Sequence, residues 1–130
     1  AEHIANKVMK LMIGKGDRIK GAKVLLMGIT FKENCPDIRN TKVVDIYNEL
    51  IDFGVEVDVY DPWADAEEVK EEYGIEISDK VDNSKLYDGV ILAVAHRQFK
   101  EYDLKRQKEN NAVIYDVKNF LDRDLVDGRL

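Results

Sequence analysis

Two uninterrupted apolar runs, Val24–Met27 and Val90–Val94, most constrain the fold of this 130-residue chain. Neither run alternates apolar with polar residues, as a strand with one solvated face would, so each is expected to be a strand buried on both faces. Strands of this kind occur in parallel sheets that are covered by helices on both sides. The two runs therefore predict an α/β fold.

Helical and extended patterns alternate along the rest of the chain. Helices are expected at about residues 2–14, 43–51, 64–73 and 99–109, and strands at 23–27, 55–60, 75–77, 89–94 and 112–116. This alternation is typical of a parallel sheet with right-handed crossovers. We therefore expect a three-layer Rossmann-like domain in which five parallel strands have the order 3-2-1-4-5, with helices on both faces.

The expected strand order also locates a ligand crevice. The order reverses between the first and the fourth strand, and open α/β sheets bind ligands at such a reversal, outside the carboxyl ends of the strands. The crevice is therefore expected between the loop after Gly28 and the loop after Val94.

Composition and charge exclude several classes of protein. The net charge of −6 argues against a nucleic-acid partner, because binding to a phosphate backbone needs a basic face. No apolar stretch approaches the roughly 18 residues that a membrane-spanning helix needs. One cysteine cannot form an internal disulfide, which fits a reducing cytoplasm, and two histidines offer no zinc ligand set.

Four cationic residues follow the expected strands in an otherwise acidic chain. Lys32 and Arg39 come after the first strand, Arg97 after the fourth and Lys118 after the fifth. A lysine offers a point charge and an arginine a bidentate fork to phosphate oxygens, so the cluster predicts a site for a phosphorylated ligand. The alternative for any one of them alone is an ordinary solvated cation.

The loop after the first strand lacks the pattern that binds a complete dinucleotide. Such a loop carries three glycines, and an acidic residue follows about 20 positions later. Only Gly28 is present here, and Asp61, at the end of the second strand, lies too far along the chain. The fold is expected to be Rossmann-like without cradling a whole dinucleotide.

For the other reactive residues, a local structural role is the simplest interpretation. Asp37 is expected to orient Arg39 or to close the loop through backbone hydrogen bonds, and Asp61 to form a strand-end turn that caps the next helix. Cys35 has no neighbouring partner and is expected to be an inert thiol. His96 lies at the lip of the crevice, where it could bond a ribose or uracil group or be satisfied by the protein itself.

Several separated motifs resemble those of one enzyme family. They are Gly28-x-x-Phe31-Lys32 with Asp37-x-Arg39-x-Thr41, then Val94-Ala95-His96, and finally Tyr115-Asp116-Val117-Lys118. In this order they resemble the C-terminal, nucleotide-sugar-binding domain of the UDP-glucose/GDP-mannose dehydrogenase family, and most of all the branch acting on UDP-N-acetylhexosamines. The resemblance runs from about residue 2 to the end of the chain.

The resemblance implies a role for each matching residue. Phe31 and Lys32 would contact the nucleotide sugar, Lys118 would contact the same substrate, and Arg39 would reach NAD that is held mainly by an N-terminal domain outside this chain. Residues 1–15 would form a helix leading from an upstream part of the enzyme, and 16–130 the binding domain.

The resemblance also implies an activity for the longer enzyme. That enzyme would oxidise the C6 hydroxyl of a UDP-sugar in two NAD-dependent steps, making a UDP-uronic acid for surface polysaccharide synthesis. Its partners would be the UDP-sugar, the upstream NAD-binding and central domains, and further copies in a homo-oligomer. The catalytic cysteine would lie in the preceding domain, so this chain alone is predicted to be inactive.

The alternative is a stand-alone flavodoxin-like module that regulates or binds a nucleotide without catalysis, such as a phospho-receiver. A receiver needs paired acidic residues after the first strand and a phosphoacceptor aspartate after the third. The first strand instead ends in Gly28-Ile29-Thr30, which argues against that interpretation.

Overall fold

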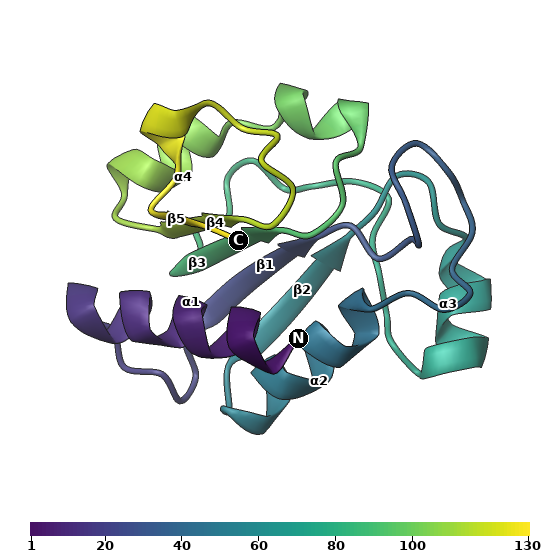
Figure 1. Cartoon of the computed structure of the whole chain (residues 1–130), viewed down its shortest axis with the longest axis horizontal. Helices are drawn as coiled ribbons and strands as arrows, with labels where there is room; N and C mark the ends of the chain where they lie inside the picture. The colour runs from purple at the N-terminus through teal and green to yellow at the C-terminus, as the bar shows by residue number, and fades with distance from the viewer.

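Five parallel strands form the centre of the fold, in the order β2-β1-β3-β4-β5. They are β1 (Lys23–Met27), β2 (Glu56–Tyr60), β3 (Gly89–Leu92), β4 (Val113–Asp116) and β5 (Gly128–Arg129). The computed structural model describes residues 1–130, and Figure 1 shows helices on both sides of this sheet. The expected three-layer parallel α/β fold is confirmed.

The two apolar runs form the two central strands. All four residues of β3 are buried, as are all residues of β1 except Lys23. In the register of the sheet, Leu26 lies between Val59 of β2 and Ile91 of β3. Because successive side chains of a strand point to opposite faces, an apolar run of this kind supplies core residues to both layers of helices.

One edge of the sheet differs from the expectation. No strand forms at 75–77. The next residue, Ser78, makes only an isolated parallel bridge with Tyr60, which pairs too few backbone groups to extend the sheet. The fifth strand is instead β5, at the opposite edge beside β4. A Cβ atom on Gly128 would lie 2.9 Å from the ring of Tyr115, so a residue without a side chain allows β5 to approach β4.

The helices and short helical turns are distributed over both faces. They are α1 (Glu2–Lys15), α2 (Val43–Asp52), α3 (Ala66–Tyr73) and α4 (Leu104–Glu109), with 3₁₀ turns η1 (Arg97–Glu101) and η2 (Arg123–Leu125). The helix expected at 99–109 is divided, because Asp103 caps a new helix by accepting a hydrogen bond from the amide of Arg106. None of the helices combines the length and the apolar character needed to span a membrane.

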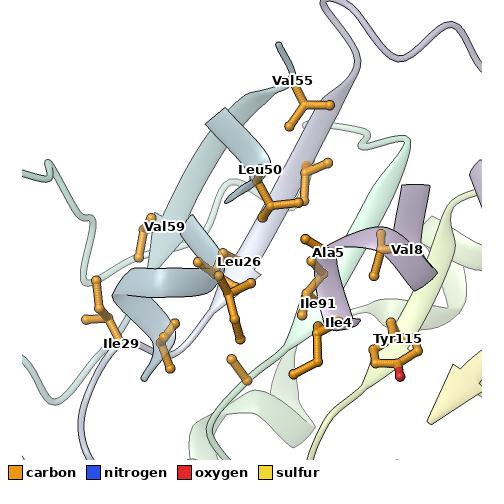
Figure 2. Packing of buried hydrophobic residues seen from close by; sticks show 14 of the residues in the cluster. Ile4, Ala5, Val8, Leu26, Ile29, Leu50, Val55, Val59, Ile91 and Tyr115 are labelled. Carbon is orange, nitrogen blue, oxygen red and sulfur yellow. The ribbon is translucent and has the colours of Figure 1, made fainter. Parts of the chain in front are cut away.

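Each face of the sheet has its own hydrophobic core. On one face, α1 and α2 cover the sheet, and Figure 2 shows Ile4, Ala5 and Val8 of α1 and Leu50 of α2 among the buried residues that meet the strands. On the other face, η1, α4 and η2 cover side chains such as Met27. The two cores cover the sheet on both faces, and the carboxyl ends of its parallel strands form one common edge.

Gly28 brings two loops together at that edge. Its φ of 98° is a left-handed conformation, and a Cβ atom built there would lie 2.6 Å from the Cβ atom of Val94. Both conditions favour glycine at position 28, because L side chains disfavour this φ and Val94 already fills the space that a side chain would need. The loop after β1 therefore starts in contact with the loop after β3, where the crevice was expected.

Gly28→Ala should lower the free energy of unfolding by about 2–5 kcal/mol, because a left-handed alanine and an overfilled contact with Val94 are both unfavourable. Gly16→Ala is the matched control: its φ is 104°, yet nothing lies within 4 Å of a Cβ atom there. That variant should lose only about 1–2 kcal/mol. Urea unfolding of both variants measures the difference, and equal losses would mean that the contact with Val94 has no energetic weight.

Candidate functional site

The loop between β1 and α2, residues 28–42, projects beyond the carboxyl edge of the sheet (Figure 1). The amide of Phe31 donates to the carbonyl of Asp37 at 2.7 Å and closes a turn within it. At its end, Thr41 Oγ1 accepts a hydrogen bond from the amide of Val43 at 3.2 Å, which satisfies one free donor at the start of α2. The loop is therefore a long segment ordered by its own hydrogen bonds, and not a tight strand-to-helix turn.

A buried carboxylate at the end of β2 holds the start of this loop. Asp61 is fully buried, and its Oδ2 accepts from the amides of Ile29 at 2.7 Å and Thr30 at 3.3 Å. Its Oδ1 accepts from the amides of Trp63 at 2.7 Å and Ala64 at 3.0 Å. The expected turn at the end of β2 is present, but Asp61 does not cap α3, the next helix.

The cap of α3 is Asp65, which accepts from the first amides of that helix. Burial alone would raise the pKa of Asp61, yet the hydrogen bonds from His96 and from the amide of Ile29 outweigh burial and hold the pKa below its usual value. The carboxylate of Asp61 is therefore ionised in the folded chain at neutral pH.

The imidazole of His96 joins the loop to this carboxylate. It is fully buried, its Nδ1 accepts from the amide of Asn34 at 3.0 Å, and its Nε2 lies 3.0 Å from Asp61 Oδ2 and 3.1 Å from Thr30 Oγ1. Because Nδ1 accepts, the ring is neutral and carries its proton on Nε2. A direct contact between His96 and a ribose or uracil group does not fit this arrangement, since neither ring nitrogen is free.

A cavity of about 240 Å³ lies at the same edge. It is lined by residues from α1, the loop after β1, α2 and the ends of β3 and β4: Ala1, Ile4, Thr30, Phe31, Thr41, Lys42, Val43, Ile46, Ala93, Val94, Val117, Lys118 and Leu130. Its walls are mostly apolar, with two lysines at the rim. Apolar walls with a few polar groups are one property of small-molecule sites.

The four cations expected around one crevice do not all lie at the cavity. Lys118 lines the cavity, while Lys32 lies exposed on the adjoining loop, and neither forms an ion pair. Arg97 instead stacks over the ring of Trp63 at 5.3 Å, outside the cavity. Sequence reasoning missed Lys42, whose position between the loop and the first turn of the following helix could have identified it.

Arg39 is held by its own neighbour. Its Nε and Nη2 donate to the two carboxylate oxygens of Asp37, each at 3.0 Å, so the expectation that Asp37 orients Arg39 is confirmed. These hydrogen bonds lower the pKa of Asp37 to about 2. Phe31, Asp37, Arg39 and Asn40 line a second hollow of about 140 Å³, so Phe31 lies between the cavity and the guanidinium.

The loop that carries Lys118 is fixed in a similar manner. Asp116 is fully buried at the end of β4, and its carboxylate accepts from the amides of Lys118 at 2.9 Å and of Phe120 and Leu121 at 2.8 Å each. Arg129 of β5 donates to the carbonyl of Leu121 at 2.5 Å. Phe31 and Lys118 therefore face one cavity from loops that are both anchored by buried carboxylates.

The loop after β1 differs from the loop that binds a pyrophosphate in a dinucleotide fold. A dinucleotide fold presents a helix N-terminus directly after its first strand, where backbone amides meet the pyrophosphate. Here residues 28–42 separate β1 from α2, and the amides at the start of the loop are bound to Asp61.

Known proteins with similar sequences are nucleotide-sugar dehydrogenases. Residues 25–123 match the UDP binding domain of the UDP-glucose/GDP-mannose dehydrogenase family. The chain is 46% identical over 131 residues to the UDP-N-acetyl-D-glucosamine 6-dehydrogenase of Pseudomonas aeruginosa, and 44% identical to that of Salmonella typhi. Each alignment covers 98% of this chain and 31% of the relative, so the chain spans about a third of their length.

Solved structures share the fold at lower identity. UDP-D-ManNAc dehydrogenase from Pyrococcus horikoshii superposes with a TM-score of 0.75 at 15% identity, over 98% of this chain and 30% of that chain. NDP-N-acetyl-D-galactosaminuronic acid dehydrogenase from Methanosarcina mazei gives a TM-score of 0.74 at 22% identity, over 95% and 27% respectively. The arrangement of strands and helices is therefore found in proteins of well-diverged sequence.

Asp61→Asn should lower the free energy of unfolding by about 1–3 kcal/mol at pH 7, because an amide at position 61 leaves part of the buried hydrogen-bond network unsatisfied. The folded pKa of Asp61 lies below its unfolded value, so its stabilisation is present above about pH 4 and is lost as the pH falls further. The free energy of unfolding of the variant should therefore fall less steeply as the pH decreases below about 4. Urea unfolding between pH 7 and pH 3 measures both effects. If the free energy of unfolding falls equally with pH in both proteins, ionised Asp61 is not a source of the stability.

Proposed function

We propose a function from one premise: this chain belongs to the UDP-glucose/GDP-mannose dehydrogenase family, whose UDP binding domain it matches. In this proposal, the cavity at the carboxyl edge of the sheet binds the nucleotide part of a UDP-sugar. The observation that carries the proposal is the meeting of Phe31 and Lys118, from two separate loops, at one cavity beside cations that have no ion-pair partner. The substrate that we favour is a UDP-N-acetylhexosamine, because the two relatives named above act on UDP-N-acetyl-D-glucosamine.

The size and charge of the cavity support a partial nucleotide site. Its volume of about 240 Å³ is below the roughly 300–1,000 Å³ of cavities that enclose a drug-sized ligand. It suits a base and ribose, with the diphosphate at the rim near Lys32, Lys42 and Lys118. Free ammonium groups fit phosphate oxygens because each supplies a charge with several donors. The sugar would then extend away from this chain.

The oxidation itself would use groups outside this chain. Converting the C6 alcohol of the sugar to a carboxylate removes four electrons as two hydrides, which two NAD molecules accept, while one water supplies the second oxygen. Within residues 1–130, Cys35 is a half-buried loop thiol and both nitrogens of His96 are engaged, so no activated nucleophile is at hand. We propose that α1 leads from the NAD-binding and central parts of a longer enzyme.

UDP should bind to this chain, and Lys118→Ala should weaken the binding about 10- to 150-fold, which corresponds to losing a charge-assisted hydrogen bond. Lys32→Ala should have an effect in the same direction. Lys20→Ala is the matched control, since Lys20 is an exposed lysine that precedes β1 at the opposite edge of the sheet. Isothermal titration with UDP measures all four proteins. If Lys20→Ala and Lys118→Ala weaken binding equally, net charge and not the cavity accounts for it.

Arg39→Ala should chiefly affect NAD in the longer enzyme. The side chain of Arg39 is 83% exposed, and Asp37 holds its guanidinium at the mouth of the site, where it can reach a cofactor bound by another domain. Its loss should raise the apparent KM for NAD by about 10- to 150-fold, with less effect on the UDP-sugar. Arg39→Lys should recover part of the loss. Titration of NADH fluorescence without sugar provides a readout independent of turnover, and an unchanged NADH affinity would refute the role.

A further inference from the structure

The turn that carries Phe31 and Lys32 is attached to the rest of the fold on both sides. Before it, the amides of Ile29 and Thr30 donate to the carboxylate of Asp61. After it, the amide of Asn34 donates to Nδ1 of His96. These attachments join three segments that are far apart in the sequence: the loop after β1, the end of β2 and the loop after β3.

The same network reaches the backbone of Lys32 directly. Thr30 Oγ1 lies 3.1 Å from His96 Nε2 and donates to the carbonyl of Lys32 at 2.9 Å. Asn34 in turn accepts a hydrogen bond from the amide of Arg97 through its side-chain oxygen, at 2.9 Å. Asp61 and His96 are fully buried and Thr30 is 1% exposed, so water does not compete for these bonds.

Stability alone is a weak reason for such a network. Burying a carboxylate is unfavourable unless every lone pair is satisfied, and apolar residues of similar volume often stabilise a fold as well or better. What a satisfied polar network adds is a single geometry, because its directional bonds fix both the position and the orientation of the segments that it joins. Here the segment whose geometry is fixed is the one that carries the proposed ligand contacts.

We propose that Asp61 and His96 are positioning residues, which hold the Phe31–Lys32 turn in the geometry that receives the nucleotide before the ligand arrives. The inference rests on the proposed function of the cavity and extends it to two residues that touch no ligand. A preorganised loop binds more tightly because the ligand does not have to order its side chains. Releasing Phe31 and Lys32 should therefore weaken UDP binding by about 5- to 100-fold.

Substitutions at position 96 can separate the two halves of the network. His96→Gln can keep a donor near Nε2 for Asp61 and Thr30 but removes the acceptor for the amide of Asn34. His96→Asn can keep that acceptor near Nδ1 but removes the donor. Each variant should retain part of the UDP affinity that His96→Ala loses, because each keeps one of the two attachments.

A second buried amide network offers a control for general destabilisation. Gln107 is 1% exposed and bonds the amide of Tyr87, the carbonyl of Lys85 and the hydroxyl of Tyr102 at 2.8–2.9 Å, before the amino end of β3. Gln107→Leu should lower the melting temperature as His96→Ala does. It should leave the UDP affinity of the folded protein unchanged, because it releases no part of the nucleotide loop.

The experiment measures melting temperature, UDP affinity by calorimetry at a temperature where every variant is folded, and hydrogen exchange of the Phe31 amide. That amide is bonded to the carbonyl of Asp37 and touches neither positioning residue, so its protection reports the closed turn. We expect weaker UDP binding and faster Phe31 exchange in His96→Ala, partial recovery in His96→Gln and His96→Asn, and neither change in Gln107→Leu.

Two outcomes would overturn the inference. In the first, His96→Ala has a lower melting temperature but binds UDP as tightly as the unchanged chain. Asp61 and His96 would then stabilise the fold without positioning the nucleotide loop. The other is unchanged Phe31 exchange, which would mean that the turn does not depend on His96. A chain that binds no UDP at all would instead refute the proposed function, and the exchange measurement would still decide whether the pair positions the turn.

Discussion

The buried carboxylate of Asp61 accepts hydrogen bonds from three directions, and it joins three segments at the carboxyl edge of the sheet. Its bonds join the end of β2 to the loop after β1 and, through His96, to the loop after β3. A carboxylate can remain ionised in this position because each of its oxygens faces amide or imidazole donors. Because Thr30 both donates to this carboxylate and lines the cavity, the carboxylate connects the three segments beside the cavity.

The sequence predicted the sheet well where burial is complete on both faces. The bounds of β1 agree with the strand expected at 23–27, and the order of the four strands shared by expectation and structure is confirmed. The edges were less predictable, because β5 is only Gly128–Arg129 and has no apolar pattern, while 75–77 has a strand-like pattern but little backbone pairing. Edge pairing depends on close packing such as that of Gly128 on Tyr115, which no local pattern records.

The candidate site was predictable in part. Cations at strand ends predicted a site at the edge where the cavity lies, since the ends of parallel strands meet there, and the motif around Phe31 and Lys32 predicted one of the loops that adjoin it. The network beneath them was not predictable. Asp61 and His96 are 35 residues apart and meet only after β1, β2 and β3 are in register, and a buried imidazole has the same sequence signature as an exposed one.

The cavity is assembled from parts of the chain that extend from Ala1, before α1, to Leu130, after β5. No single segment, and no pair of neighbouring segments, contains enough of the wall to bind a ligand by itself. Any ligand of this cavity therefore has affinity for the native state alone, and its binding free energy adds to the cooperative stability of the domain. The concentration of such a ligand would then help to set how much of the domain is folded.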